Sequence, residues 1–142
     1  MRLLFIFTLS VFTALSAQAQ QKQVDKKGIA SFYHDKFEGR QTATGEVFDN
    51  DKFTAACNTI KLNTYVKVTN LSNGEVVYVR INDRMAKTNQ RLIDLAAVAA
   101  KKLNFKGNGI ADVKLEVVPE EEGRCGILAQ REMEQMAPVN KL

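Results

Sequence analysis

The chain has 142 residues, which is enough for one domain and too few for two of ordinary size. Its 25% charged and 45% hydrophobic residues are typical of a folded globular protein, and a formal charge of +4 falls short of the dense basic stripe of nucleic-acid-binding proteins. Two cysteines and one histidine cannot supply a zinc site of four such ligands. We therefore expect neither a nucleic-acid partner nor a metal ion.

The N-terminus has the pattern of a secretory signal peptide. Arg2 supplies a positive start, residues 3–15 are mostly apolar, and Ala17-Gln18-Ala19 has the small-x-small form of a cleavage site. The apolar run is short for a bilayer span. We predict cleavage after Ala19, export to the periplasm or cell envelope, and a soluble product without stable membrane insertion. The alternative is an anchor that is never cleaved.

Export would place both cysteines in an oxidising compartment, where disulfides form and persist. Cys57 and Cys125 allow a single intramolecular bridge, which would tie the C-terminal segment to the middle of the domain. A loop of this length would add roughly 4 kcal/mol in the chain-entropy model. We expect this disulfide. The alternative is that Cys57 is a free thiol, and with His34 it would form a nucleophile pair of the kind used by cysteine hydrolases.

The first elements after the signal are short. Residues 20–27 are polar and predict a flexible leader, and residues 28–34 predict the first strand. Residues 35–51 form a long connection, which we expect to be ordered because apolar side chains anchor it. A short strand is expected at 53–57.

A hairpin is the strongest local signal in the middle of the chain. Residues 65–71 and 75–84 are rich in β-branched side chains, and Asn73-Gly74 between them is the dipeptide most typical of tight hairpin turns. We therefore expect the two strands to pair antiparallel.

The second of these strands ends in a carboxylate. Because side chains alternate between faces, Asp83 should share the core face with Val77, Val79 and Ile81, at the rim of the core. A carboxylate that is partly withdrawn from water suits a general acid. The alternative is a structural one, in which Asp83 pairs with Arg84 or caps a turn.

The second half of the chain predicts one helix and one strand. Asp94 is a good N-cap for a helix at 95–103, which has lysines in its last turn. Residues 110–118 alternate apolar and charged side chains, which is the clearest strand pattern in the chain. Short strands with one helix predict a small barrel that removes its own edges. We divide the chain into the signal, the leader, a barrel domain at 28–118 and a C-terminal tail at 119–142 that is able to form a helix and is tied back by the disulfide.

Several ordered motifs carry a family resemblance. They are Gly28-x-Ala30-Ser31-Phe32-Tyr33, Phe37-x-Gly39-Arg40-x-Thr42-Ala43-x-Gly45-Glu46-x-Phe48-Asp49, Thr54-Ala55-Ala56, Val66-x-Val68-Thr69-Asn70-Leu71, Asn73-Gly74, Val79-x-Ile81-Asn82-Asp83-Arg84 and Leu92-Ile93-Asp94-Leu95. In this order and spacing they resemble the rare-lipoprotein-A-like family of septal ring lytic transglycosylases, which is related to the expansins. The resemblance implies a mainly β fold, namely a six-stranded double-psi β-barrel with one or two short helices.

The resemblance also implies an activity. Studied members of the family cleave peptidoglycan glycan strands without water and leave a 1,6-anhydro sugar end, and they need no metal and no cofactor. Their catalytic carboxylates correspond to Asp83 and Glu46. Asp83 would protonate the glycosidic oxygen and then accept the proton of the sugar 6-hydroxyl, while Glu46 would assist by stabilising the developing positive charge or by positioning the sugar. We expect a monomer whose partner is the glycan strand.

Further side chains are candidates for substrate contacts. Tyr33 and Phe37 would stack on a sugar ring, although such side chains more often belong to the core. Arg40 and Arg84 would meet the carboxylates of peptidoglycan, unless each pairs with a neighbouring Asp. The other substrate-binding candidates are Thr44, Asn82 and Cys57, the last of which stands where the family has a His.

Two positions depart from the family pattern. Cys57 replaces that His, and Met85 replaces a Gly. A thiol cannot act as the donor and acceptor pair that an imidazole provides, and His34 is a candidate substitute. Both carboxylates favour the enzyme, whereas the missing His favours a non-catalytic, expansin-like module that binds cell-wall glycan. A third reading is an inhibitor or effector domain on the same scaffold, because fold does not fix function.

Overall fold

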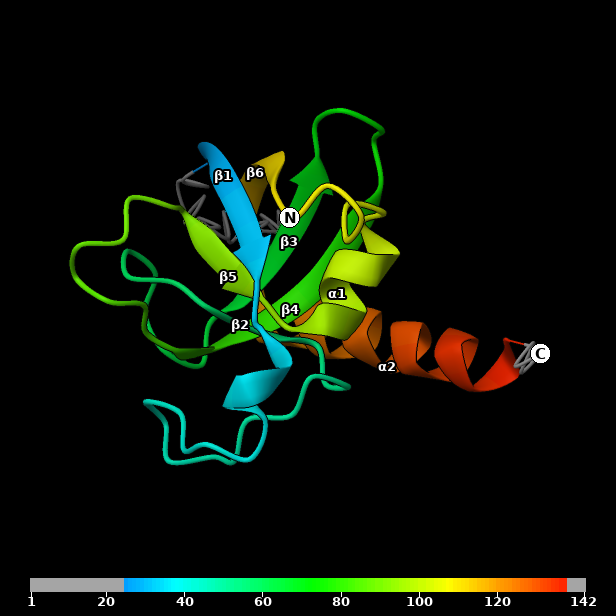
Figure 1. The fold of residues 1–142 in the computed structure, drawn as a ribbon. Coiled ribbons are helices and arrows are strands. Elements are labelled where there is room, and N and C mark those ends of the chain that lie inside the picture. The colour runs from blue at the N-terminus through cyan, green and yellow to red at the C-terminus, as the bar shows by residue number, and fades with distance from the viewer. Residues whose placement is uncertain (1–24, 138–142) are drawn as a thin grey trace, which may run out of the picture.

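The protein is described here by a computed structural model covering residues 25–137 (Figure 1). The expected signal peptide and most of the leader lie outside the described residues. Within 25–137 no helix is both long and apolar enough to cross a membrane. The chain forms β1 (Lys26–Phe32), a 3₁₀ turn (Asp35–Phe37), β2 (Thr54–Ala56), β3 (Tyr65–Asn70), β4 (Val76–Asp83), β5 (Ile93–Leu95), α1 (Ala97–Lys102), β6 (Ala111–Val118) and α2 (Glu120–Met136).

The six strands close into a barrel in the order β1-β5-β2-β4-β3-β6. The pairs β1–β5 and β2–β4 are parallel, and the other neighbours are antiparallel. Every strand therefore has two partners, and no open edge is available for pairing with another chain. This confirms the expected closed barrel.

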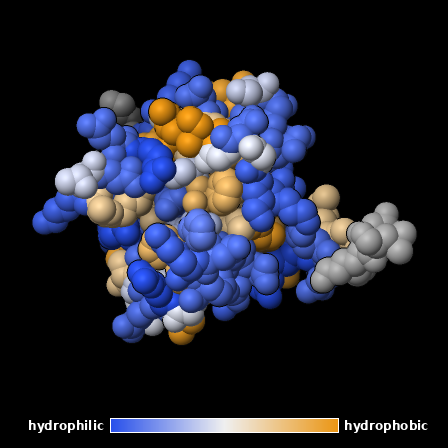
Figure 2. Space-filling model, viewed as in Figure 1, coloured by the Kyte–Doolittle hydropathy of each residue, from blue (hydrophilic) through white to orange (hydrophobic). Residues whose placement is uncertain are grey.

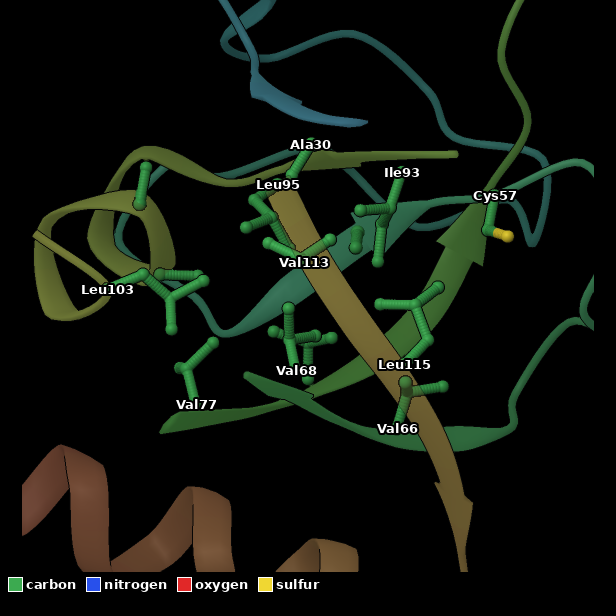
Figure 3. Packing of buried hydrophobic residues seen from close by; sticks show 14 of the residues in the cluster. Ala30, Cys57, Val66, Val68, Val77, Ile93, Leu95, Leu103, Val113 and Leu115 are labelled. Atoms are coloured by element: carbon green, nitrogen blue, oxygen red, sulfur yellow. The ribbon is translucent and has the colours of Figure 1, made fainter. Parts of the chain in front are cut away.

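Alternation along the strands fills the barrel interior. Val66 and Val68 of β3 and Val77, Val79 and Ile81 of β4 are all 0% exposed, and Figure 3 shows inward-pointing side chains from β5 and β6 meeting them. The outside is mostly hydrophilic in the view of Figure 2, with a few separate hydrophobic patches. Burial of this apolar area is the main stabilising term of the fold.

The predicted hairpin is confirmed. β3 and β4 pair antiparallel, with Val68 opposite Val77. The turn between them uses Gly74 at a φ of +77°, a left-handed conformation that glycine adopts without steric cost. The N–H of Asn70 donates to the carbonyl of Glu75 at 2.8 Å, which closes the turn.

The predicted helix at 95–103 is partly wrong. Residues Ile93–Leu95 form β5, and α1 begins only after Ala96. Asp94 therefore lies in a strand and caps no helix. The side chain of Asn50 takes that role, since its Oδ1 accepts the N–H of Ala97 at 2.9 Å. A strand of three residues is too short to show an alternation of apolar and polar side chains. When a helix follows it directly, the sequence pattern does not distinguish the strand from the helix.

The leader also ends earlier than predicted. β1 starts at Lys26, which lies opposite Leu115 of β6, so residues 26 and 27 belong to the barrel. Their polar side chains gave no strand signal, because this end of β1 is only partly covered.

The predicted disulfide is not formed. Both cysteines are free: Cys57 is fully buried in the barrel core, and Cys125 is exposed on α2. The face of α2 that meets the barrel carries the neighbouring glycines Gly123 and Gly126. One thiol is therefore enclosed by the core while the other is open to solvent, and no bond joins them.

Two glycines let α2 lie directly on two tyrosine side chains, Tyr65 of β3 and Tyr78 of β4. A Cβ atom added at Gly123 would lie 2.2 Å from Tyr65, and one added at Gly126 would lie 2.5 Å from Tyr78. Real Cβ atoms do not approach so closely, so both positions require glycine. This contact uses few apolar side chains of the helix, which explains why residues 124–136 show only weak helical periodicity in the sequence.

The side chain of Gln130 completes the pairing of β4. Its Oε1 accepts the N–H of Tyr78 at 2.6 Å, and its Nε2 donates to the carbonyl of Tyr78 at 2.9 Å. β2 pairs with β4 only from Arg80 onward, so no backbone of β2 lies beside Tyr78. The side-chain amide of Gln130 satisfies the backbone N–H and carbonyl of Tyr78 in its place.

Replacing Gln130 with Ala should therefore destabilise the barrel. The N–H and carbonyl of Tyr78 would lose both partners, and an unsatisfied buried polar group costs about 1–3 kcal/mol. Gln130 is 5% exposed, whereas Gln135 on the same helix is exposed and makes a matched control. Urea denaturation should give a lower free energy of unfolding for Q130A and an unchanged value for Q135A. Equal values for the two variants would contradict this role.

Candidate active site

A β-bulge at the end of β4 decides where Asp83 points. Ala55 of β2 lies opposite Ile81, but the next residue, Ala56, lies opposite Asp83, so Asn82 is the extra residue. Ile81 and Asn82 are both buried, and the alternation restarts after them. The expectation that Asp83 shares the core face of the strand is therefore wrong. The bulge turns Asp83 outward to a half-buried position.

Both oxygens of Asp83 accept hydrogen bonds. Oδ2 accepts the hydroxyl of Tyr33 at 2.7 Å, and Oδ1 accepts the backbone N–H groups of Ala43 at 2.9 Å and Arg84 at 2.8 Å. These donors come from three different segments and fix the carboxylate in one orientation. The guanidinium of Arg84 does not pair with Asp83. It donates instead to the carbonyls of Cys57 and, at 2.7 Å, of Ile60.

Asp83 lies in the wall of a groove of about 520 Å³. The walls come from the end of β1, the long loop after it, the end of β4 and the segment that leads into β5. They carry a second carboxylate, several aromatic rings and several cations. Among the lining residues are Asp83, Asp94, His34, Phe37, Arg40, Arg91 and Met85.

Asp94 is a functional candidate that sequence reasoning missed. It lies in the middle of β5, and the hydroxyl of Ser31 donates to its Oδ1 at 2.8 Å. Burial raises the pKa of Asp94 and the negative charge of Asp83 adds to the rise, while the Ser31 hydrogen bond and Arg91 oppose it. In the sequence, Asp94 stands out as a carboxylate within an apolar run, and we interpreted this residue as a helix N-cap.

Tyr33 is buried with its ring among other aromatic side chains, whereas Phe37 lies in the wall of the groove. Tyr33 is 8% exposed and packs between Phe48, with 4.3 Å between ring centroids, and Phe37, with 5.7 Å. Burial, and next the hydrogen bond to Asp83, raise the pKa of Tyr33, so its hydroxyl stays a donor. The ring of Phe37 is half-buried in the groove wall, and the guanidinium of Arg40 lies 5.1 Å from its centroid.

Glu46 does not line the groove. Its carboxylate forms a two-pronged ion pair with Arg80, at 2.7 and 2.5 Å, and also accepts the hydroxyl of Thr44 at 2.7 Å. The Arg80 hydrogen bond is the main reason that the pKa of Glu46 falls to about 2. The side chain is 41% exposed, so the pair is open to solvent.

One turn nevertheless links the two carboxylates predicted to be catalytic. Residues 42–46 carry Glu46 at one end, and their backbone reaches the end of β4. The N–H of Ala43 donates to Asp83, and the N–H of Thr44 donates to the carbonyl of Asn82 at 3.2 Å. Glu46 therefore helps to shape the turn that holds Asp83, whereas its own carboxylate lies outside the groove.

The two departures from the family pattern lie on different sides of the barrel wall. Cys57 is buried, and its Sγ lies 3.6 Å from the hydroxyl oxygen of Thr59. Its backbone N–H donates to the backbone carbonyl of Asp83 at 3.2 Å. Met85 lines the groove. His34 also lines it, and its Nδ1 accepts the N–H of Lys36 at 3.2 Å. Cys57 and His34 therefore form no nucleophile pair. Among residues 25–137, no three acidic, cysteine or histidine side chains are grouped to hold a metal ion.

Replacing Glu46 with Gln should change stability only in a defined pH range. The pKa of Glu46 is lowered from 4.5 to about 2, so its contribution is complete above pH 4.5 and is lost as the pH falls toward 2. Because the pair is exposed, the difference from wild type at pH 7 should be below about 1 kcal/mol. Urea denaturation from pH 7 to pH 2 should show the difference vanishing, and R80Q should behave alike. A difference that stays constant down to pH 2 would contradict this account.

The sequence is similar to that of known proteins. A family model described as lytic transglycolase matches residues 25–115. The endolytic peptidoglycan transglycosylase RlpA of Haemophilus influenzae is 46% identical over 99 residues, which are 70% of this chain and 34% of that protein. The protein of the same name from Pseudomonas aeruginosa is 51% identical over 89 residues, which are 63% of this chain and 26% of that protein. The chain thus spans about a third or less of the length of these relatives.

Solved structures share the fold. The Streptomyces papain inhibitor superposes with a TM-score of 0.55 at 21% identity, covering 68% of this chain and 96% of that one. The apo expansin of Clavibacter michiganensis gives 0.55 at 20% identity, covering 68% and 52%. These neighbours confirm the predicted double-psi β-barrel. With a family model that matches well over half of its length, the chain belongs to the lytic transglycolase family.

Proposed function

We propose that the protein cleaves peptidoglycan glycan strands as a lytic transglycosylase and that the groove is its active site. The observation that carries this proposal is the pair Asp83 and Asp94 in one groove, with the pKa of Asp94 raised. Two carboxylates kept in different environments are the arrangement that glycoside cleavage requires. The relatives named endolytic peptidoglycan transglycosylase support the choice of substrate.

The hydrogen bonds favour a division of labour between the two carboxylates. Sequence reasoning gave both proton transfers to Asp83, but both of its oxygens already accept hydrogen bonds from fixed donors. Asp94 accepts one, from Ser31, and its raised pKa suits a proton donor. We therefore assign proton transfer to Asp94. Asp83 supplies the negative charge that stabilises the oxocarbenium-like transition state.

The reaction then needs no water. Asp94 protonates the glycosidic oxygen as the bond from that oxygen to the anomeric carbon breaks. The 6-hydroxyl oxygen of the same sugar bonds to the anomeric carbon, and its proton passes to Asp94, which restores the acid. The products are one strand with a free hydroxyl and one with a 1,6-anhydro end, so every proton is accounted for.

Glu46 acts indirectly in this proposal. It holds Arg80 and Thr44, and the turn it closes presents the N–H of Ala43 to Asp83. Glu46 is thus a positioning residue. Phe37 and Arg40 offer a ring and a cation in the groove wall, which suit a sugar ring and a carboxylate of the strand. We further propose that the protein acts as an exported monomer in the periplasm or cell envelope, where this substrate lies.

A second candidate is a non-catalytic module that binds cell-wall glycan. Cys57 stands at the position of the family's His and is buried away from the groove, so no imidazole reaches the site from that position. A Clavibacter michiganensis expansin in complex with cellohexaose shares the fold, with a TM-score of 0.54 at 19% identity over 68% of this chain and 51% of that one. A groove without cleavage would suit such a module.

Replacing Asp94 with Asn should abolish cleavage. Loss of a positioned general acid typically costs a factor of about 10² to 10⁴ in rate. The mature protein would be incubated with glycan strands, and anhydro-ended products would be quantified by mass spectrometry. D83N should lose activity as well. D112N is a matched control, because Asp112 is exposed on β6, and it should retain full activity.

The same assay separates the two candidates. Retained activity in D94N with loss in D83N would return proton transfer to Asp83. A wild-type protein that releases no anhydro product and still sediments with purified sacculi would contradict the enzyme and leave the binding module. Thermal melts of each variant would show whether the fold is kept.

A further inference from the structure

The loop that joins β4 to β5 supplies one wall of the groove. It covers residues 84–92, and Figure 1 shows it projecting from the barrel. Met85 and Asn89 of this loop line the groove together with Asp83 and Asp94. The proposed mechanism uses the two carboxylates, which flank the loop, and leaves Met85 and Asn89 without a role.

Hydrogen bonds to the segment after β2 hold the backbone of Met85 in place. Its N–H donates to Oδ1 of Asn58 at 2.9 Å, and Nδ2 of Asn58 donates to the carbonyl of Ala86 at 3.4 Å. On the preceding side, the guanidinium of Arg84 donates to the carbonyl of Ile60 at 2.7 Å. Met85 is therefore anchored to the barrel from both sides, and its side chain starts from a fixed point in the groove wall.

The side chain of Met85 is half-buried and gives the groove an apolar surface. It packs, as Phe37 does, against a small buried cluster that contains Tyr33. Because the hydroxyl of Tyr33 donates to Asp83 at 2.7 Å, this apolar surface lies beside that carboxylate. The flexible thioether of a methionine adapts its shape to a small apolar group. Met85 therefore suits a methyl group of a ligand that is bound next to Asp83.

Asn89 places a polar group next to this apolar surface. Its Nδ2 lies 3.6 Å from Sδ of Met85, and its Oδ1 accepts the N–H of Arg91 at 3.0 Å. A thioether sulfur is only a weak acceptor, so the Nδ2 group is available to a stronger acceptor such as a carbonyl. The two side chains thus offer an apolar contact and an amide donor side by side.

We infer that Met85 and Asn89 form a subsite for the acetamido group of an N-acetylated sugar. The methyl of that group contacts Met85, and its carbonyl accepts a hydrogen bond from Nδ2 of Asn89. The choice of ligand rests on the proposed function, because the sugars of peptidoglycan carry an acetamido group at C2, where a plain glucan carries a hydroxyl. The subsite directs the groove to strands of amino sugars rather than to glucans.

Equilibrium binding of two matched ligands tests this subsite without any turnover. Chitohexaose and cellohexaose share one β-1,4-linked backbone and differ at C2, where the first carries acetamido groups and the second hydroxyls. Isothermal titration would be done in a D94N background, which should not cleave either ligand. Chitohexaose should bind with a Kd about fourfold lower than cellohexaose, because burial of one methyl group is worth about that factor.

Variants of the loop then separate the subsite from a structural role. The backbone of Met85 is not in the left-handed region, so alanine and leucine both fit there. M85A should bring the ratio of the two Kd values close to one, whereas M85L keeps an apolar side chain and should preserve it. N89D keeps the Oδ1 that accepts from Arg91 but loses the donor, and it should lower the ratio too. K87A is the matched control, because Lys87 is exposed on the same loop and does not line the groove.

The ratio decides between the outcomes. Equal affinity for the two hexasaccharides, or a ratio that M85A and N89D leave unchanged, would overturn the inference. Wild-type protein that releases anhydro product from glycan strands but shows no such preference would refute the subsite and leave the proposed activity intact. A preference that M85A and N89D remove, in a wild-type protein that makes no anhydro product, would support the subsite and contradict the activity.

Discussion

A single extra residue in β4 positions the carboxylate on which the proposed chemistry depends. Without the bulge at Asn82, the alternation of Val77, Val79 and Ile81 would direct Asp83 into the core, where no substrate could reach it. With the bulge, the core keeps its apolar side chains, and Asp83 enters the groove wall. The turn at residues 42–46 depends on the same feature, since its backbone bonds both to Asp83 and to the carbonyl of Asn82.

Electrostatics then differentiates the acidic side chains near this point. Asp94 is half-buried with one hydrogen bond, beside the negative charge of Asp83, and its pKa rises. Glu46 is more exposed and held by Arg80, and its pKa falls. Tyr33 connects the core to the groove, because its ring packs with Phe48 while its hydroxyl donates to Asp83. Local surroundings, rather than residue type, thus raise the pKa of one carboxyl group and lower that of the other.

Sequence patterning predicted the elements that have their own period. The hairpin and β6 alternate clearly, and the closed barrel and its family follow from ordered motifs. It missed what depends on tertiary contacts: the bulge adds a residue without changing composition, β5 is too short to show a period, and α2 contacts the barrel through glycines. The disulfide with Cys125 was inferred from compartment and cysteine count, neither of which contains geometry. Asp94 was visible in the sequence but was assigned to the wrong element.

The account depends most on the raised pKa of Asp94 beside the charge of Asp83. Carboxyl ¹³C chemical shifts of the mature protein, followed by NMR from pH 2 to pH 8, would measure this directly. The titration midpoint of Asp94 should lie above the ordinary value of 3.8, mainly because of burial, and D83N should lower it by removing a neighbouring negative charge. A midpoint at or below 3.8 that D83N leaves unchanged would contradict the account.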